Sequence, residues 1–218
     1  MKLQAFDIAQ AASATSIVFD ALRQAIINGD LAEGEHLRQD EIARAFNISR
    51  IPVREALVKL EQHGLVSTQR FKGAVVSALS PAEADEIFAF RALLEPEVIR
   101  RAVPRLSPEM LASARACCDA FAGADDPMLW GDLNRRFHAT LYEASALPYH
   151  MEVLNNAMDR VDRYLRAQLL LSNGMERANR EHRAILAACA AGDAESAAEL
   201  TRRHILDARD SLIRHLGG

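Results

Sequence analysis

The chain has 218 residues, of which 50% are hydrophobic and 26% are charged, a composition that supports a buried core and excludes a disordered protein. It contains no run of about 18 apolar residues, so we expect no membrane span. The first residues show no basic segment followed by an apolar stretch, so we expect no secretory signal. Three cysteines without framework spacing fit a reducing compartment, and we expect a cytoplasmic protein.

The formal net charge of −4 conceals a basic region. Residues 38–76 carry seven Lys or Arg against four Asp or Glu, a net charge of +3. DNA affinity depends on local phosphate contacts rather than on total charge. The composition is therefore compatible with DNA binding but does not establish it.

Helical periodicity dominates the first part of the chain. An apolar stripe over residues 17–27 predicts a helix that ends at Gly29. A short helix is predicted over 40–46, and a third over 50–63 with Ser49 as its N-cap.

The strand-like residues follow the third helix. Residues 65–69 and 74–77 are strand-like, and residues 70–73 connect them, which predicts a small hairpin. Three helices followed by a hairpin are typical of a winged helix-turn-helix.

The rest of the chain predicts helices only. Ser80-Pro81 and Ser107-Pro108 are cap-then-proline starts. The predicted helices cover 81–103, 108–122, 127–144, 148–171, 176–191 and 194–216. The expected fold class is mainly α: a winged helix-turn-helix with a small β-hairpin wing over residues 1–78, and an all-α helical bundle over 79–218.

Arg50 and Arg54 are four residues apart, so they share one face of the third helix. The first turns of a recognition helix reach base edges in the major groove, where arginine suits guanine. Lys59 could reach the DNA backbone, and the basic tip 70–73 could touch a minor groove or phosphates. The alternative is a solvated basic helix face, and spacing alone does not decide.

The N-terminal region closely resembles the GntR family of bacterial transcription regulators. The most specific segment is Ser49-Arg-Ile-Pro-Val-Arg-Glu-Ala-Leu57, and about 60 residues share the likeness. The resemblance implies a winged helix-turn-helix that binds operator DNA. One departure is Asp40, which stands where the family usually has a DNA-contacting arginine, and Arg38 is a possible substitute. The candidate DNA-binding residues are Arg38, Ser49, Arg50, Arg54, Lys59, Arg70, Lys72 and Gly73.

Three histidines lie on otherwise apolar helical stripes, namely His138, His182 and His204. Asn134 precedes His138 by one turn on the same face. Imidazoles from three helices could meet at one divalent metal ion, with zinc as the first choice and nickel or another transition metal as alternatives. The competing interpretation is that they are satisfied core histidines, and both stay open.

The C-terminal region resembles the all-helical effector domain called FCD, found in the FadR-like branch of the GntR family. The likeness rests on Asn134-Arg-Arg-Phe-His138, on Glu181-His182 and on Arg203-His204. It implies a divalent metal held by one Asp and three His, in which Asn134 occupies the Asp position. A neutral amide there leaves the full positive charge of the metal uncompensated, which would attract an anion.

Arg91 shares an apolar stripe with Ile87 and Leu94, so we expect it to point inward. A buried guanidinium needs an anion. The family resemblance implies that Arg91 binds the carboxylate of a small organic acid. The alternative is an internal ion pair with Glu95.

The sequence thus predicts a regulator rather than an enzyme, with no catalytic residues. We expect a homodimeric repressor that binds double-stranded, near-palindromic operator DNA and responds to a small carboxylate effector at a metal-centred pocket. The alternatives are a metal-dependent enzyme with an accessory DNA-binding module and a metal sensor.

Overall fold

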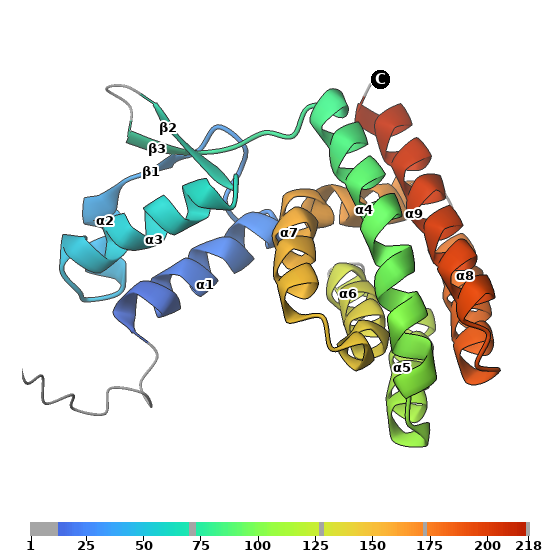
Figure 1. Ribbon diagram of the computed structural model, residues 1–218. Helices are drawn as coiled ribbons and strands as arrows, with labels where there is room; N and C mark the ends of the chain where they lie inside the picture. Colours follow the sequence, from blue (N-terminus) through green and yellow to red (C-terminus); the bar gives the residue numbers. More distant parts are fainter. Residues whose placement is uncertain (1–12, 70–72, 127–128, 172–173, 217–218) are drawn as a thin grey trace, which may run out of the picture. The chain divides into compact units, whose positions relative to one another are not determined.

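The computed structural model describes residues 13–69, 73–126, 129–171 and 174–216, and it contains two compact units, Met1–Ala78 and Leu79–Gly218 (Figure 1). Three helices and a three-stranded sheet make up the described part of the first unit. In chain order they are α1 (Ala14–Asn28), β1 (His36–Leu37), α2 (Gln39–Ala45), α3 (Arg50–Gln62), β2 (Val66–Gln69) and β3 (Gly73–Val76).

Local signals in the sequence set the ends of α1. The side chain of Ser13 accepts a hydrogen bond from the backbone N–H of Ser16 at 3.1 Å, which caps the first turn. Gly29 ends the helix in the left-handed conformation at φ 84°, where a side chain would be strained. The inward face of α1 packs on α3 through residues such as Val18, Leu22 and Leu60.

The sheet is antiparallel, in the order β1-β3-β2. Thr68 pairs with Ala74 in the predicted hairpin, and Leu37 of β1 also pairs with Ala74 from the other side. β1 has only two residues, too few to show a strand period, and sequence reasoning missed it. The residues between β2 and β3, which include the predicted DNA contacts Arg70 and Lys72, lie outside the described residues.

The second unit is helical throughout its described part. Its helices are α4 (Pro81–Ala102), α5 (Pro108–Ala122), α6 (Trp130–Tyr142), α7 (Pro148–Leu171), α8 (Gly174–Ala190) and α9 (Ala194–Leu216), with short 3-10 turns η1 (Val103–Arg105) and η3 (Glu143–Ser145). The predicted helix 127–144 is shorter here, because α6 starts at Trp130 and η3 takes over after Tyr142. Residues 127 and 128 lie outside the described residues.

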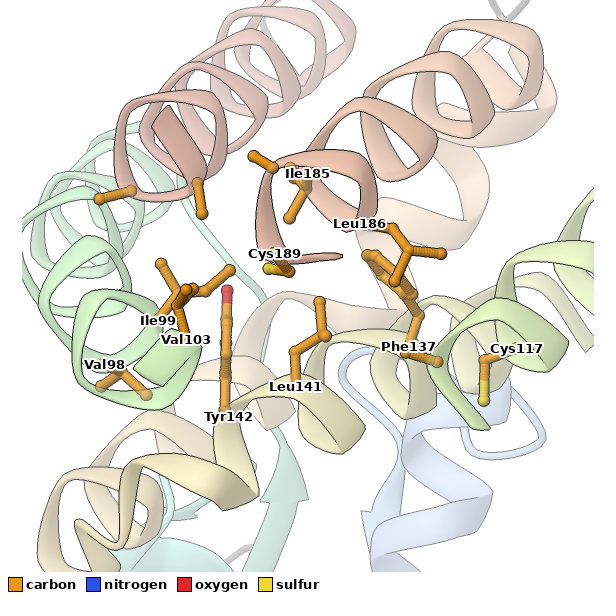
Figure 2. Packing of buried hydrophobic residues seen from close by; sticks show 14 of the residues in the cluster. Val98, Ile99, Val103, Cys117, Phe137, Leu141, Tyr142, Ile185, Leu186 and Cys189 are labelled. Carbon is orange, nitrogen blue, oxygen red and sulfur yellow. The ribbon is translucent and has the colours of Figure 1, made fainter. Parts of the chain in front are cut away.

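Side chains from α4, α6 and α8 fill the interior of the bundle. Figure 2 shows Ile99, Leu141, Tyr142 and Ile185 meeting between these helices. Cys189 lies in the same cluster, and burial raises the pKa of its thiol to about 12, so it serves as a small core residue.

A second cluster joins α4 to its neighbour α9, which runs alongside it (Figure 1). Phe88 of α4, Val161 of α7 and Ile205 of α9 are fully buried there. These two clusters fix the faces of α6, α8 and α9 that turn toward the centre of the bundle. The fold class expected from the sequence, a winged helix-turn-helix and an all-helical bundle, is confirmed. No helix in the described residues has the length and apolar character needed to cross a membrane.

A buried group of charges ties α6 to α7. Nη1 of Arg135 lies 2.6 Å from Oδ1 of Asp159 and 2.6 Å from Oδ2 of Asp162. Both carboxylates are buried, and desolvation raises the pKa of Asp162 even though Arg135 acts in the opposite direction. Two acids out of water thus share one guanidinium as their common counter-charge.

We predict that Arg135→Met lowers the free energy of unfolding of the helical unit by about 3 kcal/mol, because it removes the guanidinium that both buried carboxylates contact. Chemical denaturation followed by circular dichroism measures this loss. Arg136→Met is the matched control, since Arg136 is exposed on the same helix. It should change stability by no more than about 0.5 kcal/mol. Equal losses in both variants would contradict the prediction.

Candidate metal centre and DNA-binding surface

Three helices each direct one imidazole into the bundle. His138 comes from α6, His182 from α8 and His204 from α9, and all three are buried. One ring nitrogen from each lies within 4.8 Å of the others. They are brought together because each histidine lies on the apolar stripe of its helix, and the three stripes face a common core.

Hydrogen bonds define which nitrogen of His204 faces the centre. Oε2 of Glu181 lies 2.7 Å from Nδ1 of His204. A carboxylate only accepts, so Nδ1 carries a proton, and Nε2 has its lone pair whenever the ring carries that proton alone.

A longer chain of contacts orients His138. The hydroxyl of Tyr142 donates to Oε2 of Glu95 at 2.7 Å and lies 3.3 Å from Nδ1 of His138. Since the hydroxyl hydrogen is committed to Glu95, its oxygen accepts from Nδ1 of His138, and Nε2 of that ring also keeps its lone pair.

The two lone pairs therefore face each other. Nε2 of His138 lies 3.2 Å from Nε2 of His204. Two acceptors at this distance repel unless a proton or a cation lies between them. Nitrogens bound at about 2.0–2.1 Å to a tetrahedral metal lie about 3.3 Å apart, so the observed spacing suits a shared ion.

His182 gives a second, independent indication. It is 0% exposed, and within the described part of the chain neither of its ring nitrogens has a hydrogen-bond partner. Its ring packs against those of Phe121, Phe137, His138 and His204. A buried imidazole with two unsatisfied nitrogens is costly, and a metal ion would satisfy one of them.

Burial also favours the neutral form of His138 and His182. Desolvation, followed by the neighbouring histidines and Arg91, holds the pKa of His138 well below its usual value. Desolvation and then His204 do the same for His182. Neutral imidazole is the form that coordinates a metal, so this donor set fits a divalent transition-metal ion.

A small cavity of about 30 Å³ adjoins the histidine cluster. Its lining includes His204, Asn134, Glu181, Arg91 and Arg177. Asn134 is half-buried on α6, one turn before His138, so the amide predicted at the metal site lies at the edge of this cavity.

Arg91 is buried, as expected, at 3% exposure. Its Nε donates to Oε1 of Glu95 at 2.6 Å, so the internal ion pair considered from the sequence is present. Within the described residues its Nη1 is buried without a partner, and the side chain also lines the cavity. Arg91 can therefore hold Glu95 and still offer donors to an anion.

Sequence reasoning gave no role to Arg177, Tyr142 or the carboxylate of Glu181. Arg177 lies 3.7 Å from Glu181 and places a second guanidinium at the cavity. The helical spacing of Arg177 and Glu181, four residues apart, is the signal that could have found this pair. Tyr142 is four residues after His138, which also places it on the same face.

The first unit presents its candidate DNA-binding residues on the outer face of α3. Val53, Leu57 and Leu60 occupy the inner face, so Arg50 and Arg54 are exposed. The other described candidates, Arg38, Ser49, Lys59 and Gly73, are exposed as well. Ser49 is the N-cap residue of α3, but its side chain makes no capping hydrogen bond, contrary to the capping role expected from the sequence.

Two further side chains belong to this surface. Ile51 is 63% exposed in the first turn of α3, where an apolar group suits the methyl of thymine. Arg44 of α2 donates from Nε to the carbonyl oxygen of Asp40 at 3.2 Å and borders an open hollow with Arg50. Neither had been assigned a role from the sequence.

Two family models match the chain, one for each part. Residues 14–76 match the bacterial regulatory proteins of the gntR family, and residues 86–207 match the FCD domain. The chain belongs to the GntR family of transcription regulators, in its FCD-containing branch. The family predicted from the sequence is confirmed.

Relatives agree with this assignment. The GntR regulator is similar to the uncharacterized HTH-type transcriptional regulator BphR of Paraburkholderia xenovorans, with 28% identity over 96% of this chain and 89% of that protein. It is also 28% identical to the HTH-type transcriptional repressor GlaR of Escherichia coli, over 85% of this chain and 89% of GlaR. These relatives are named regulators, and the chain is a DNA-binding regulator rather than an enzyme.

A solved structure shares the fold. The Escherichia coli protein McbR/YncC superimposes with a TM-score of 0.83, at 23% identity, over 94% of this chain and 99% of that one. The GntR regulator therefore has the fold of that protein.

We expect His182→Ala to reduce the metal content of the purified protein. Loss of a group that only orients a ligand weakens metal binding by about tenfold or more, and loss of the ligand itself should weaken it further. Elemental analysis of folded protein measures the metal per chain. His150→Ala is the control, since His150 lies outside the cluster of three. Equal metal in wild type and His182→Ala would show that His182 is a core histidine.

Proposed function

We propose that this GntR regulator is a homodimeric repressor whose hold on a near-palindromic operator responds to a small organic acid bound at a metal-centred pocket. The observation that carries the proposal is the group of three buried imidazoles beside a cavity that Arg91 also lines. The similarity to GlaR, a named repressor, supports the mode of regulation. A regulator of bacterial DNA works in the cytoplasm, which we propose as its location.

The histidines would hold the metal through neutral nitrogens, with Asn134 adding an amide oxygen. We propose zinc, with nickel or another transition metal as alternatives, since imidazole ligands suit all of them. The bound metal supplies a positive charge and open coordination positions for an oxygen ligand. Glu181 and the Glu95–Tyr142 pair orient the rings, as outer carboxylates commonly do at such sites.

The arginines would recognise the effector's charge. Arg91 offers donors at the cavity while Glu95 fixes its Nε, so its guanidinium is already held in place before a carboxylate arrives. Arg177 adds a second guanidinium at the same cavity. The donor set of the cavity therefore favours a small acid over a neutral or cationic compound.

Regulation requires that the acid prefer one arrangement of the protein over another. The acid would contact α4 through Arg91 and α9 through the metal at His204. Because α4 follows directly after the DNA-binding unit in the chain, a shift of α4 relative to α9 is the step that would change operator affinity.

A thermal-shift screen against small mono- and dicarboxylates tests the effector site. We expect one acid to raise the melting temperature of the metal-loaded wild type, since ligand at 100 times its Kd adds about 2.7 kcal/mol. Chelation, or Arg91→Met, should remove this shift. A response to metal without a response to any acid would instead indicate a metal sensor.

For the DNA-binding surface, we predict that Arg54→Ala weakens binding to a selected operator by more than about tenfold. Electrophoretic mobility shifts or fluorescence anisotropy measure the affinity. Arg101→Ala, which removes an exposed arginine from α4 of the helical unit, should leave operator binding unchanged. An Arg54→Ala variant with wild-type affinity and sequence preference would refute the role of Arg54.

A further inference from the structure

An ion pair connects the two helices of the helix-turn-helix. Oδ1 of Asp40, in the first turn of α2, contacts Nε of Arg50, the first residue of α3. Asp40, Arg44 and Arg50 border one open hollow at the surface, together with Asn47 and Ser49. Asp40 thus lies between two arginines, one on its side chain and one on its carbonyl oxygen.

Stability does not explain this pair. The side chains of Asp40 and Arg50 are 54% and 71% exposed, and exposed ion pairs contribute little to folding. An acid in the first turn also favours α2 through the helix dipole, but Glu41 already occupies that turn.

The pair also has a cost in DNA binding. A carboxylate on a surface that approaches phosphates opposes the electrostatic part of the affinity. Asp40 lies beside an arginine at the start of the recognition helix. Because it does not increase the electrostatic affinity for DNA, we look for its role in sequence recognition.

We propose that Asp40 is a positioning residue that holds Arg50 for reading a guanine base in the operator; this rests on the proposed contact of Arg50 with DNA. The carboxylate engages Nε, and the two Nη groups of the same guanidinium remain as the donor pair that matches N7 and O6 of guanine. The pair restricts the rotamers of Arg50 before DNA binds, which lowers the entropy lost in the complex.

The same ion pair lowers the affinity for non-specific DNA. An arginine whose charge is balanced by Asp40 is a poorer phosphate ligand, so random sequence gains less from it. Asp40 therefore trades non-specific affinity for sequence preference. This gives a function to the acid that replaces the arginine usual at this position in the family.

The test begins with a duplex selected by the full-length wild-type protein from a random-sequence library. Affinities are measured for that duplex, for versions with each guanine replaced in turn, and for a scrambled duplex, over a range of salt concentrations. The proteins are wild type, Asp40→Asn, Asp40→Ala, Arg50→Ala and the double variant Asp40→Ala/Arg50→Ala. Glu41→Ala is the matched control, because it removes one acid from the same helical turn.

We expect Asp40→Ala to lower the ratio of selected to scrambled affinity by about tenfold or more, with the loss concentrated at one guanine of each half-site. Asp40→Asn should do the same, and scrambled DNA should bind as well or better. In the Arg50→Ala background, Asp40→Ala should leave the preference unchanged, since Asp40 acts through Arg50. Glu41→Ala should keep the wild-type ratio.

Two results would overturn the proposal while leaving operator binding intact. If Asp40→Ala tightens both duplexes equally with the same base preferences, Asp40 only repels DNA. If Glu41→Ala lowers the ratio of selected to scrambled affinity equally, the effect comes from any acid in the first turn of α2 and not from the contact of Asp40 with Arg50. An Arg50→Ala variant with wild-type preference would overturn the Arg50 contact itself, and failure of wild type to enrich any sequence would overturn the operator proposal.

Discussion

The helical unit is built around three imidazoles that have been taken out of water. A buried polar atom must find a partner or destabilise the fold, and the three rings have six nitrogens to satisfy. Glu181 and Tyr142 take one nitrogen each from His204 and His138, on the side away from the cluster. Of the four nitrogens that remain, one from each ring lies within 4.8 Å of the others, and no described protein group other than another histidine reaches them. The converging nitrogens form a donor set that suits a cation.

Two series of side-chain contacts lead from the histidines to the same cavity. One series runs from His138 through Tyr142 and Glu95 to Arg91, with contacts of 3.3, 2.7 and 2.6 Å. The other runs from His204 through Glu181, at 2.7 Å, to Arg177, at 3.7 Å. The groups that orient His138 and His204 are thus also connected to the guanidinium groups that border the cavity. An anion in the cavity would contact the guanidinium end of both series of contacts, and so would link the proposed effector to the geometry of the histidine cluster.

Much of this arrangement was predictable, because it depends on helical period. The stripes that carry His138, His182 and His204 predict both the helices and the inward direction of the rings, and the inward position of Arg91 follows in the same way. Contacts between helices were not predictable from period alone. Adjacent residues of a helix point about 100° apart, so Glu181 faces away from His182, and only the packing of α9 shows that it reaches His204. β1 was missed for a related reason, since a two-residue strand is defined only by its partner β3.

Arg50 and Arg91 show how the same chemistry serves different ends at the surface and in the core. In both, a carboxylate from the same unit engages Nε and leaves the Nη groups to meet a ligand. Arg91 and Glu95 are almost fully buried, so their attraction is strong and the geometry is fixed by packing. Arg50 and Asp40 are exposed, so water and salt screen their attraction, and the pair orients the side chain without contributing much to stability. A buried guanidinium is therefore suited to a permanent anion pocket. In the proposal above, the exposed guanidinium of Arg50 keeps Asp40 on Nε while its Nη groups meet the base, and there the acid improves selectivity by weakening contacts with phosphates.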